Sequence, residues 1–158
     1  MTSEPVAITF RADDRTELVA RMTRLAKTRD GWVNIEPVLP EGVEPPRQGL
    51  LAFFGARGPE ALLATWIPGA RKGDGFEPTR VGLQHSAGTR VLARLAEGGL
   101  PLPEGWKVDQ DHRSRGVVAT VPDRADPEEV AAWLLGAAER VATTPLTGNW
   151  RAAFYWRV

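Results

Sequence analysis

The sequence contains no cysteine and only two histidines among its 158 residues. Disulfide bonds, thiolate nucleophiles and thiolate metal sites are therefore excluded, and a metal site would have to use carboxylates around His85 or His112. No stretch approaches the roughly 18 consecutive apolar residues of a membrane-spanning helix. Met1–Phe10 lacks the basic start and the long apolar run of a secretory signal. We therefore expect no membrane association and a cytoplasmic location.

The chain also lacks a charge bias, because 20 basic residues balance 20 acidic ones. Proteins whose main task is to hold nucleic acid or an anionic membrane usually carry a basic face, so the sequence predicts neither partner. We expect Arg15, Arg21 and Arg24, in the first predicted helix, to face solvent rather than a nucleic acid. A length of 158 residues, with 42% apolar and 25% charged residues, is typical of one soluble globular domain.

The chain begins with segments that predict a strand followed by a helix. Apolar and small residues alternate in Val6–Phe10 with the period of a half-buried strand. Asp14 offers a carboxylate that can accept hydrogen bonds from the free N–H groups of a first helical turn. The apolar stripe that follows at helical spacing comprises Leu18, Met22 and Leu25. We expect Gly31 to end this helix in a left-handed conformation.

The rest of the first half predicts three strands separated by irregular segments. Trp32–Glu36 is typical of a short strand, and the prolines of Pro37–Gln48 predict a connector without regular structure. Gly49–Ala56 and Ala61–Ile67 are apolar on both faces, which is typical of strands in the centre of a sheet. Pro68–Pro78 is rich in glycine and charged residues, and we expect a mobile surface loop there.

The second half begins with a strand that leads directly into a helix. Val81–Leu83 predicts the strand, and Ser86 has the side chain of a good N-cap for the helix. The apolar face of that helix would consist of Ala87, Val91 and Leu95.

Four more segments complete the chain. Trp106–Asp109 and Gly116–Val121 predict two strands joined by a turn. Asp126–Glu129, with the sequence DPEE, is a strong helix start because it supplies an N-cap carboxylate, a proline at the first helical position and a glutamate at the third. Trp150–Val158 has the cleanest alternation in the chain and predicts a final strand.

Together these elements predict an α+β fold, with a mixed, largely antiparallel sheet and helices packed on it. From Thr79 to Val158 the order is strand, helix, strand, strand, helix, strand, so we expect this half to form a ferredoxin-like βαββαβ unit. We expect a single domain over residues 1–158. The alternative is two halves, 1–67 and 79–158, joined by the loop 68–78.

No catalytic or metal-binding motif is present. Asp109, Asp111 and His112 are suitable ligand types, but in a strand the first two share a face and the histidine points away. His85 precedes Ser86, but the GxSxG elbow of a hydrolase does not surround them. We therefore predict neither a metal site nor a bound cofactor, and assign no catalytic residues.

The strand-to-helix junction around Ser86 is the candidate ligand site. A helix N-terminus exposes N–H groups with a partial positive charge, which suits an anion. Glycine in the first turn would let a ligand approach closely, and an arginine could add a fixed charge. The residues of this candidate site are Gln84, His85, Ser86, Gly88 and Arg90. The alternative is an ordinary capped helix start, whose histidine and glutamine bond to nearby backbone.

Two hypotheses about function follow. The first is a non-catalytic binding or interaction domain, and the second is a protein or enzyme that binds a small anionic ligand at Gln84–Arg90. Ala153 and Tyr155 lie on the last predicted strand, and if that strand is an edge of the sheet, two chains could pair there as a homodimer.

Overall fold

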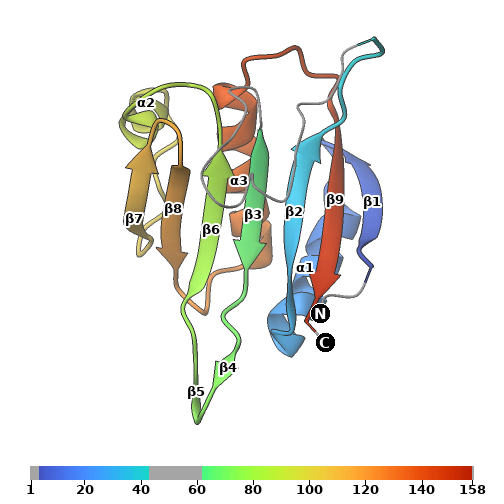
Figure 1. Ribbon diagram of the computed structural model, residues 1–158, viewed down its shortest axis with the longest axis vertical. Helices are drawn as coiled ribbons and strands as arrows, with labels where there is room; N and C mark the ends of the chain where they lie inside the picture. Colours follow the sequence, from blue (N-terminus) through green and yellow to red (C-terminus); the bar gives the residue numbers. More distant parts are fainter. Residues whose placement is uncertain (1–3, 43–61, 158) are drawn as a thin grey trace.

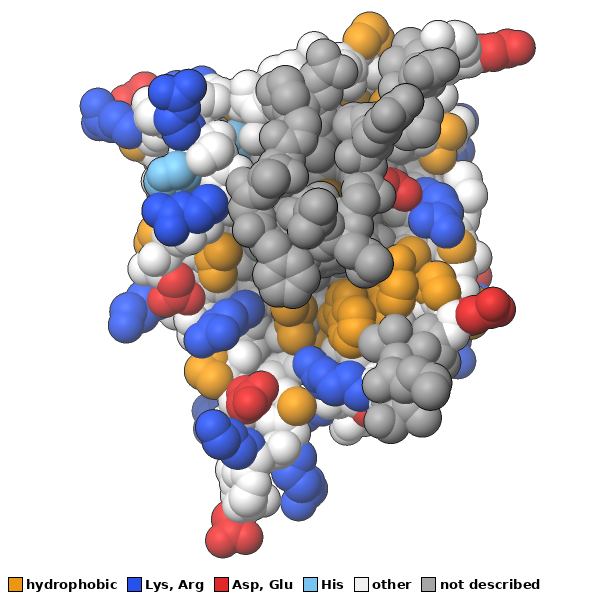
Figure 2. Space-filling view, in the orientation of Figure 1, with side chains coloured by type: hydrophobic (Ala, Val, Ile, Leu, Met, Phe, Trp, Pro, Cys, Tyr) orange, Lys and Arg blue, Asp and Glu red, His pale blue; other side chains and the backbone are white. Residues whose placement is uncertain are grey.

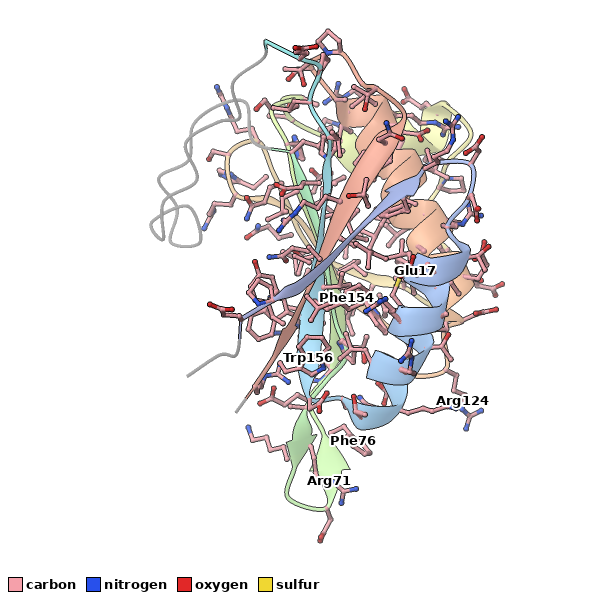
Figure 3. All side chains as sticks on the ribbon, turned by 90° about the vertical axis from the view of Figure 1, so that its right-hand side faces the viewer. Glu17, Arg71, Phe76, Arg124, Phe154 and Trp156 are labelled. Atoms are coloured by element: carbon pink, nitrogen blue, oxygen red, sulfur yellow. The ribbon has the colours of Figure 1, made fainter. Side chains whose placement is uncertain are left out.

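The structure is a computed structural model that describes residues 4–42 and 62–157. Its main feature is a seven-stranded sheet in which all neighbouring strands are antiparallel. In spatial order the strands are β1 (Val6–Arg11), β9 (Asn149–Trp156), β2 (Gly31–Pro37), β3 (Leu63–Ile67), β6 (Thr79–Gln84), β8 (Gly116–Val121) and β7 (Lys107–His112). The helices, which lie on one side of this sheet (Figure 1, Figure 3), are α1 (Thr16–Thr28), α2 (Val91–Glu97) and α3 (Pro127–Val141). The predicted α+β fold with a largely antiparallel sheet is confirmed.

The order of strands in the sheet differs from a ferredoxin-like unit. The predicted element order is present as β6-α2-β7-β8-α3-β9, but β9 pairs with β1 and β2, and β3 lies between β2 and β6. Phe154 of β9, for example, is paired with Val6 on one side and Val33 on the other. The ferredoxin-like arrangement is therefore not confirmed. The suggestion that the last strand is an edge is wrong, because β9 has a hydrogen-bonded neighbour on each side.

The helix-covered side of the sheet forms the core. On β9 the alternate residues Trp150, Ala152 and Phe154 are buried on this side, with exposed fractions of 2% or less. Helix α3 is the main cover, because eight of its residues are buried. These are Val130, Ala131, Trp133, Leu134, Leu135, Ala137, Ala138 and Val141.

The opposite side of the sheet also carries aromatic side chains. Trp32 of β2 and Tyr155 of β9 are cross-strand partners, and their parallel rings stack with centroids 5.2 Å apart. Figure 2 shows this side, with hydrophobic side chains gathered over β2 and its neighbours. Lys and Arg side chains are interspersed with Asp and Glu around them in the same view, as expected for a chain without net charge.

The predicted strands of the first half have different outcomes. Trp32–Glu36 is confirmed as a strand by β2, and the described part of Ala61–Ile67 forms β3 at the centre of the sheet. Gly49–Ala56 lies outside the described residues. The segment predicted as the loop 68–78 contains a small hairpin of β4 (Arg71–Lys72) and β5 (Gly75–Phe76), which projects beyond the sheet in Figure 1.

Helix α1 begins beside a carboxylate and ends without a glycine. Asp14 accepts hydrogen bonds from the hydroxyl and the backbone N–H of Thr16, at 2.8 and 3.3 Å, and these bonds lower the pKa of its carboxyl group. The left-handed residue after the helix is Arg29, with φ of 54°. The prediction that Gly31 ends the helix is wrong, because Gly31 is the first residue of β2. A Cβ atom at this position would lie 1.9 Å from the carbonyl oxygen of Tyr155.

Helix α3 starts at Pro127, the residue at which the sequence predicts its start. Asp126 is the N-cap, its carboxylate accepts a hydrogen bond from the backbone N–H of Glu128 at 3.0 Å, and Pro127 is the first helical residue. At 15 residues α3 is the longest of the described helices, and none of these has the length and apolar character needed to cross a membrane.

The cap of α3 gives a direct test of this start. We expect Asp126→Ala to lower the free energy of unfolding by about 1 kcal/mol, because the N–H of Glu128 loses its acceptor. Urea unfolding followed by circular dichroism measures the change. Glu139→Ala, at an exposed position near the other end of the same helix, should change the free energy by less than about 0.5 kcal/mol. Equal losses in the two variants would contradict the capping role.

Candidate functional site

The predicted junction site is a loop rather than the start of a helix. β6 ends at Gln84 and α2 begins at Val91, so the prediction that Ser86 is the N-cap is wrong. The residue before the helix is Arg90, in a left-handed conformation with φ of 56° and no side-chain capping bond. The cap comes from elsewhere in the sequence, because the backbone N–H of Leu92 donates to a carboxylate oxygen of Asp111, on β7, at 3.0 Å.

The loop between β6 and α2 is held by its own neighbours. His85 is 4% exposed, and its Nδ1 atom accepts a hydrogen bond from the backbone N–H of Ala87 at 3.1 Å. The guanidinium of Arg94 donates to the carbonyl oxygens of Ala87 and Thr89. Gly88 has a φ of 89°, so it permits the turn.

Gln84 therefore ends β6 and the other four predicted junction residues lie in the loop that follows, but the start of α2 beside them already binds the carboxylate of Asp111. Ser86 has a buried hydroxyl oxygen that finds no hydrogen-bond partner in the described part of the chain, and Arg90 is exposed. The α2 helix has only seven residues, and the carboxylate of Asp111 supplies negative charge at its first turn. An anion at Gln84–Arg90 stays a prediction, and it would have to bind beside this carboxylate.

The side chains considered as metal ligands have separate structural roles. Asp109 accepts from the hydroxyl of Thr120 at 2.6 Å, and Asp111 accepts from α2. The Nδ1 atom of His112 accepts hydrogen bonds from the backbone N–H groups of Ser114 and Arg115, each at 3.1 Å. These bonds fix the turn between β7 and β8. Within residues 4–42 and 62–157, no three His, Asp or Glu side chains gather in a group that could hold a metal ion.

A cleft with apolar and basic side chains in its lining lies between α1 and the end of β9. We call it the α1–β9 cleft, and its volume is about 240 Å³. Its lining residues are Arg21, Arg24, Leu25 and Thr28 from α1, and Phe154 and Trp156 from β9. The cleft forms because the pairing of β1 with β9 begins at Val6, opposite Phe154, whereas β9 continues to Trp156. The helix therefore extends over a part of β9 that β1 does not flank.

The floor of the α1–β9 cleft is apolar and aromatic. Leu25 and Phe154 are 3% and 2% exposed, and Trp156 is partly buried beside them. Figure 3 shows Phe154 and Trp156 on the end of β9, with α1 across from them. Alternation along the strand puts both rings on the helix side, two residues apart.

The rim of the cleft is polar and carries two guanidinium groups. Arg21 and Arg24 are three residues apart on α1, so they lie on one flank of the helix. Glu17, four residues before Arg21, forms an ion pair with it at 3.1 Å. The hydroxyl of Thr28 donates to the carboxylate of Asp30 at 2.6 Å.

Sequence reasoning did not assign these residues to a site. The sequence predicts Arg21 and Arg24 on a solvent-facing surface of the first helix, and it predicts the final strand from its alternation. One signal is present in the strand itself, because Phe154 and Trp156 continue its apolar side to its end. What the sequence lacks is any local sign that residues 21–28 and 154–156 are neighbours.

Comparisons with known proteins give no family for this chain. No protein-family model matches the sequence, and no curated protein or solved structure matches it either.

Proposed function

We propose that this chain is a non-catalytic binding domain that takes a small ligand into the α1–β9 cleft. The observation that supports this function is the composition of the cleft, in which an apolar aromatic floor lies under a rim of a few polar groups. Small-molecule sites are typically concave and mostly apolar, with a small number of polar groups that orient the ligand. The volume of about 240 Å³ suits a ligand the size of a fused pair of aromatic rings.

The residues that line the cleft support binding rather than catalysis. They are arginine, leucine, threonine, phenylalanine and tryptophan, and none of these side chains exchanges a proton near neutral pH. A general acid or base would therefore have to come from outside the lining. His85 lies in the loop between β6 and α2, and His112 is the last residue of β7. Other strands of the sheet separate both β6 and β7 from β9.

The test is a titration monitored by two-dimensional NMR, with 2-naphthoate and the neutral 2-naphthamide as probes. We expect the indole N–H signal of Trp156, assigned with Trp156→Phe, to shift with either probe in a saturable manner. Thr28→Phe places a ring in the cleft and should weaken binding by about tenfold or more, because the ring occupies the space of the ligand. Thr23→Phe is the matched control, since Thr23 is an exposed threonine of the same helix that does not line the cleft.

Two results would overturn the proposal. Binding that survives Thr28→Phe unchanged would place the ligand elsewhere. Shifts confined to the loop Gln84–Arg90 would instead favour the anion site predicted there. Circular dichroism melting of both phenylalanine variants establishes that the fold is retained.

A further inference from the structure

We propose that the ligand of the α1–β9 cleft is an aromatic carboxylate, and that Glu17 competes with it for Arg21. This inference rests on the proposed function, since it names the ligand class of the same site. The ring of the ligand would lie on the partly exposed Trp156, beside the buried Phe154, and its carboxylate would meet Arg24 and Arg21 at the rim.

The two arginines of the rim differ in what they already bind. Arg21 donates to the same carboxylate oxygen of Glu17 from Nε at 3.3 Å and from Nη2 at 3.1 Å. Arg24 is exposed, and the described part of the chain provides it with no hydrogen bond or ion pair. Arg24 is therefore the guanidinium that can receive a ligand without first losing a partner.

The ion pair between Glu17 and Arg21 is a replaceable contact. The side chain of Glu17 is 57% exposed and that of Arg21 is 31% exposed, so the pair is solvated and of a kind that contributes little to stability. A carboxylate on a bound ring would approach Arg21 from the cleft, where the aromatic floor shields part of the contact from water. Glu17 can then turn into solvent, and it acts as an internal competitor that weakens binding without blocking the site.

The chemistry of the rim and floor selects this class of ligand. A guanidinium group has a planar arrangement of donors that matches the two oxygens of a carboxylate. The floor offers the partly exposed ring of Trp156, against which another ring packs in an offset or edge-to-face arrangement. Figure 3 shows Glu17 on α1 on the same side of the sheet as the two rings. The site thus combines a flat apolar surface with positive charge at one border.

The experiment compares 2-naphthoate with 2-naphthamide, which has the same ring without the charge, by calorimetric titration. In the unchanged protein we expect the acid to bind about two- to fivefold more tightly than the amide. Arg24→Gln should remove most of this difference by weakening the acid alone. Glu17→Gln should tighten the acid about two- to fivefold and leave the amide unchanged, because Arg21 is released. Arg140→Gln, at an exposed arginine of α3, is the control and should change neither affinity.

The outcomes separate this inference from the function on which it rests. Equal affinity for acid and amide at the cleft would overturn carboxylate recognition and leave the binding function standing. Failure of both probes to shift the Trp156 signal would overturn the binding function itself. A Glu17→Gln variant that binds the acid no more tightly than the unchanged protein would overturn the competition, whatever the effect of Arg24→Gln.

Discussion

Gly31→Ala is expected to destabilise the protein by about 3 kcal/mol. The added Cβ atom would lie 1.9 Å from the carbonyl oxygen and 3.0 Å from the carbonyl carbon of Tyr155. Both are backbone atoms of β9, so no side chain can rotate out of the way. The start of β2 must move away from β9, and hydrogen bonds between these two interior strands are lost with that movement. Urea unfolding followed by tryptophan fluorescence measures the loss.

Gly75→Ala is the matched control for this prediction. Gly75 also lies in a strand, but the nearest heavy atom to its added Cβ would be 4.0 Å away, an ordinary contact distance. We expect the control to change the free energy of unfolding by less than about 0.5 kcal/mol. If Gly31→Ala unfolded within about 1 kcal/mol of the unchanged protein, the close approach of β2 to Tyr155 would be wrong.

Trp150→Ala is expected to cost about 3–5 kcal/mol of stability. Trp150 is 1% exposed, and by volume it is the largest fully buried side chain among the described residues. Its removal leaves a cavity between β9 and the helices that cannot collapse without moving the sheet. Chemical denaturation measures the change, and Trp150→Phe should lose less because most of the ring volume is retained.

A second tryptophan tests whether the loss depends on the side of the sheet. Trp32 lies on the side of the sheet opposite the described helices, is partly exposed, and stacks on Tyr155. Trp32→Ala should therefore cost only about 1–2 kcal/mol, from the stacking contact and partial burial. Equal losses for Trp150→Ala and Trp32→Ala would contradict the assignment of the core to the helix side.

The sequence predicted those elements whose signals are local. The start of α3 follows from Asp126 and Pro127, because an N-cap and the residue after it act within one helical turn. Strands such as β2 and β9 were recognisable because side chains alternate between two faces whatever the strand pairs with. The α+β class follows from the succession of such elements.

The features that could not be predicted depend on contacts between distant residues. α2 begins at Val91 because Asp111, on another strand, accepts the N–H of Leu92, and no pattern near Ser86 reveals that partner. Gly31 is required for a close approach to Tyr155, whereas its position after a helix suggested a left-handed turn. The α1–β9 cleft likewise depends on the place of β9 in the sheet, which no local signal gives.

The position of β9 between β1 and β2 has a consequence for how the protein is made. On the ribosome, β1, α1 and β2 emerge long before residues 149–156, and the strand that joins β1 to β2 does not yet exist. Until it arrives, both strands present unpaired edges that can bind other chains. Closing the gap requires contacts between residues far apart in the sequence, which slows folding. We therefore expect assembly of this sheet to be completed only after synthesis of β9, and nascent chains to be the species most prone to aggregation.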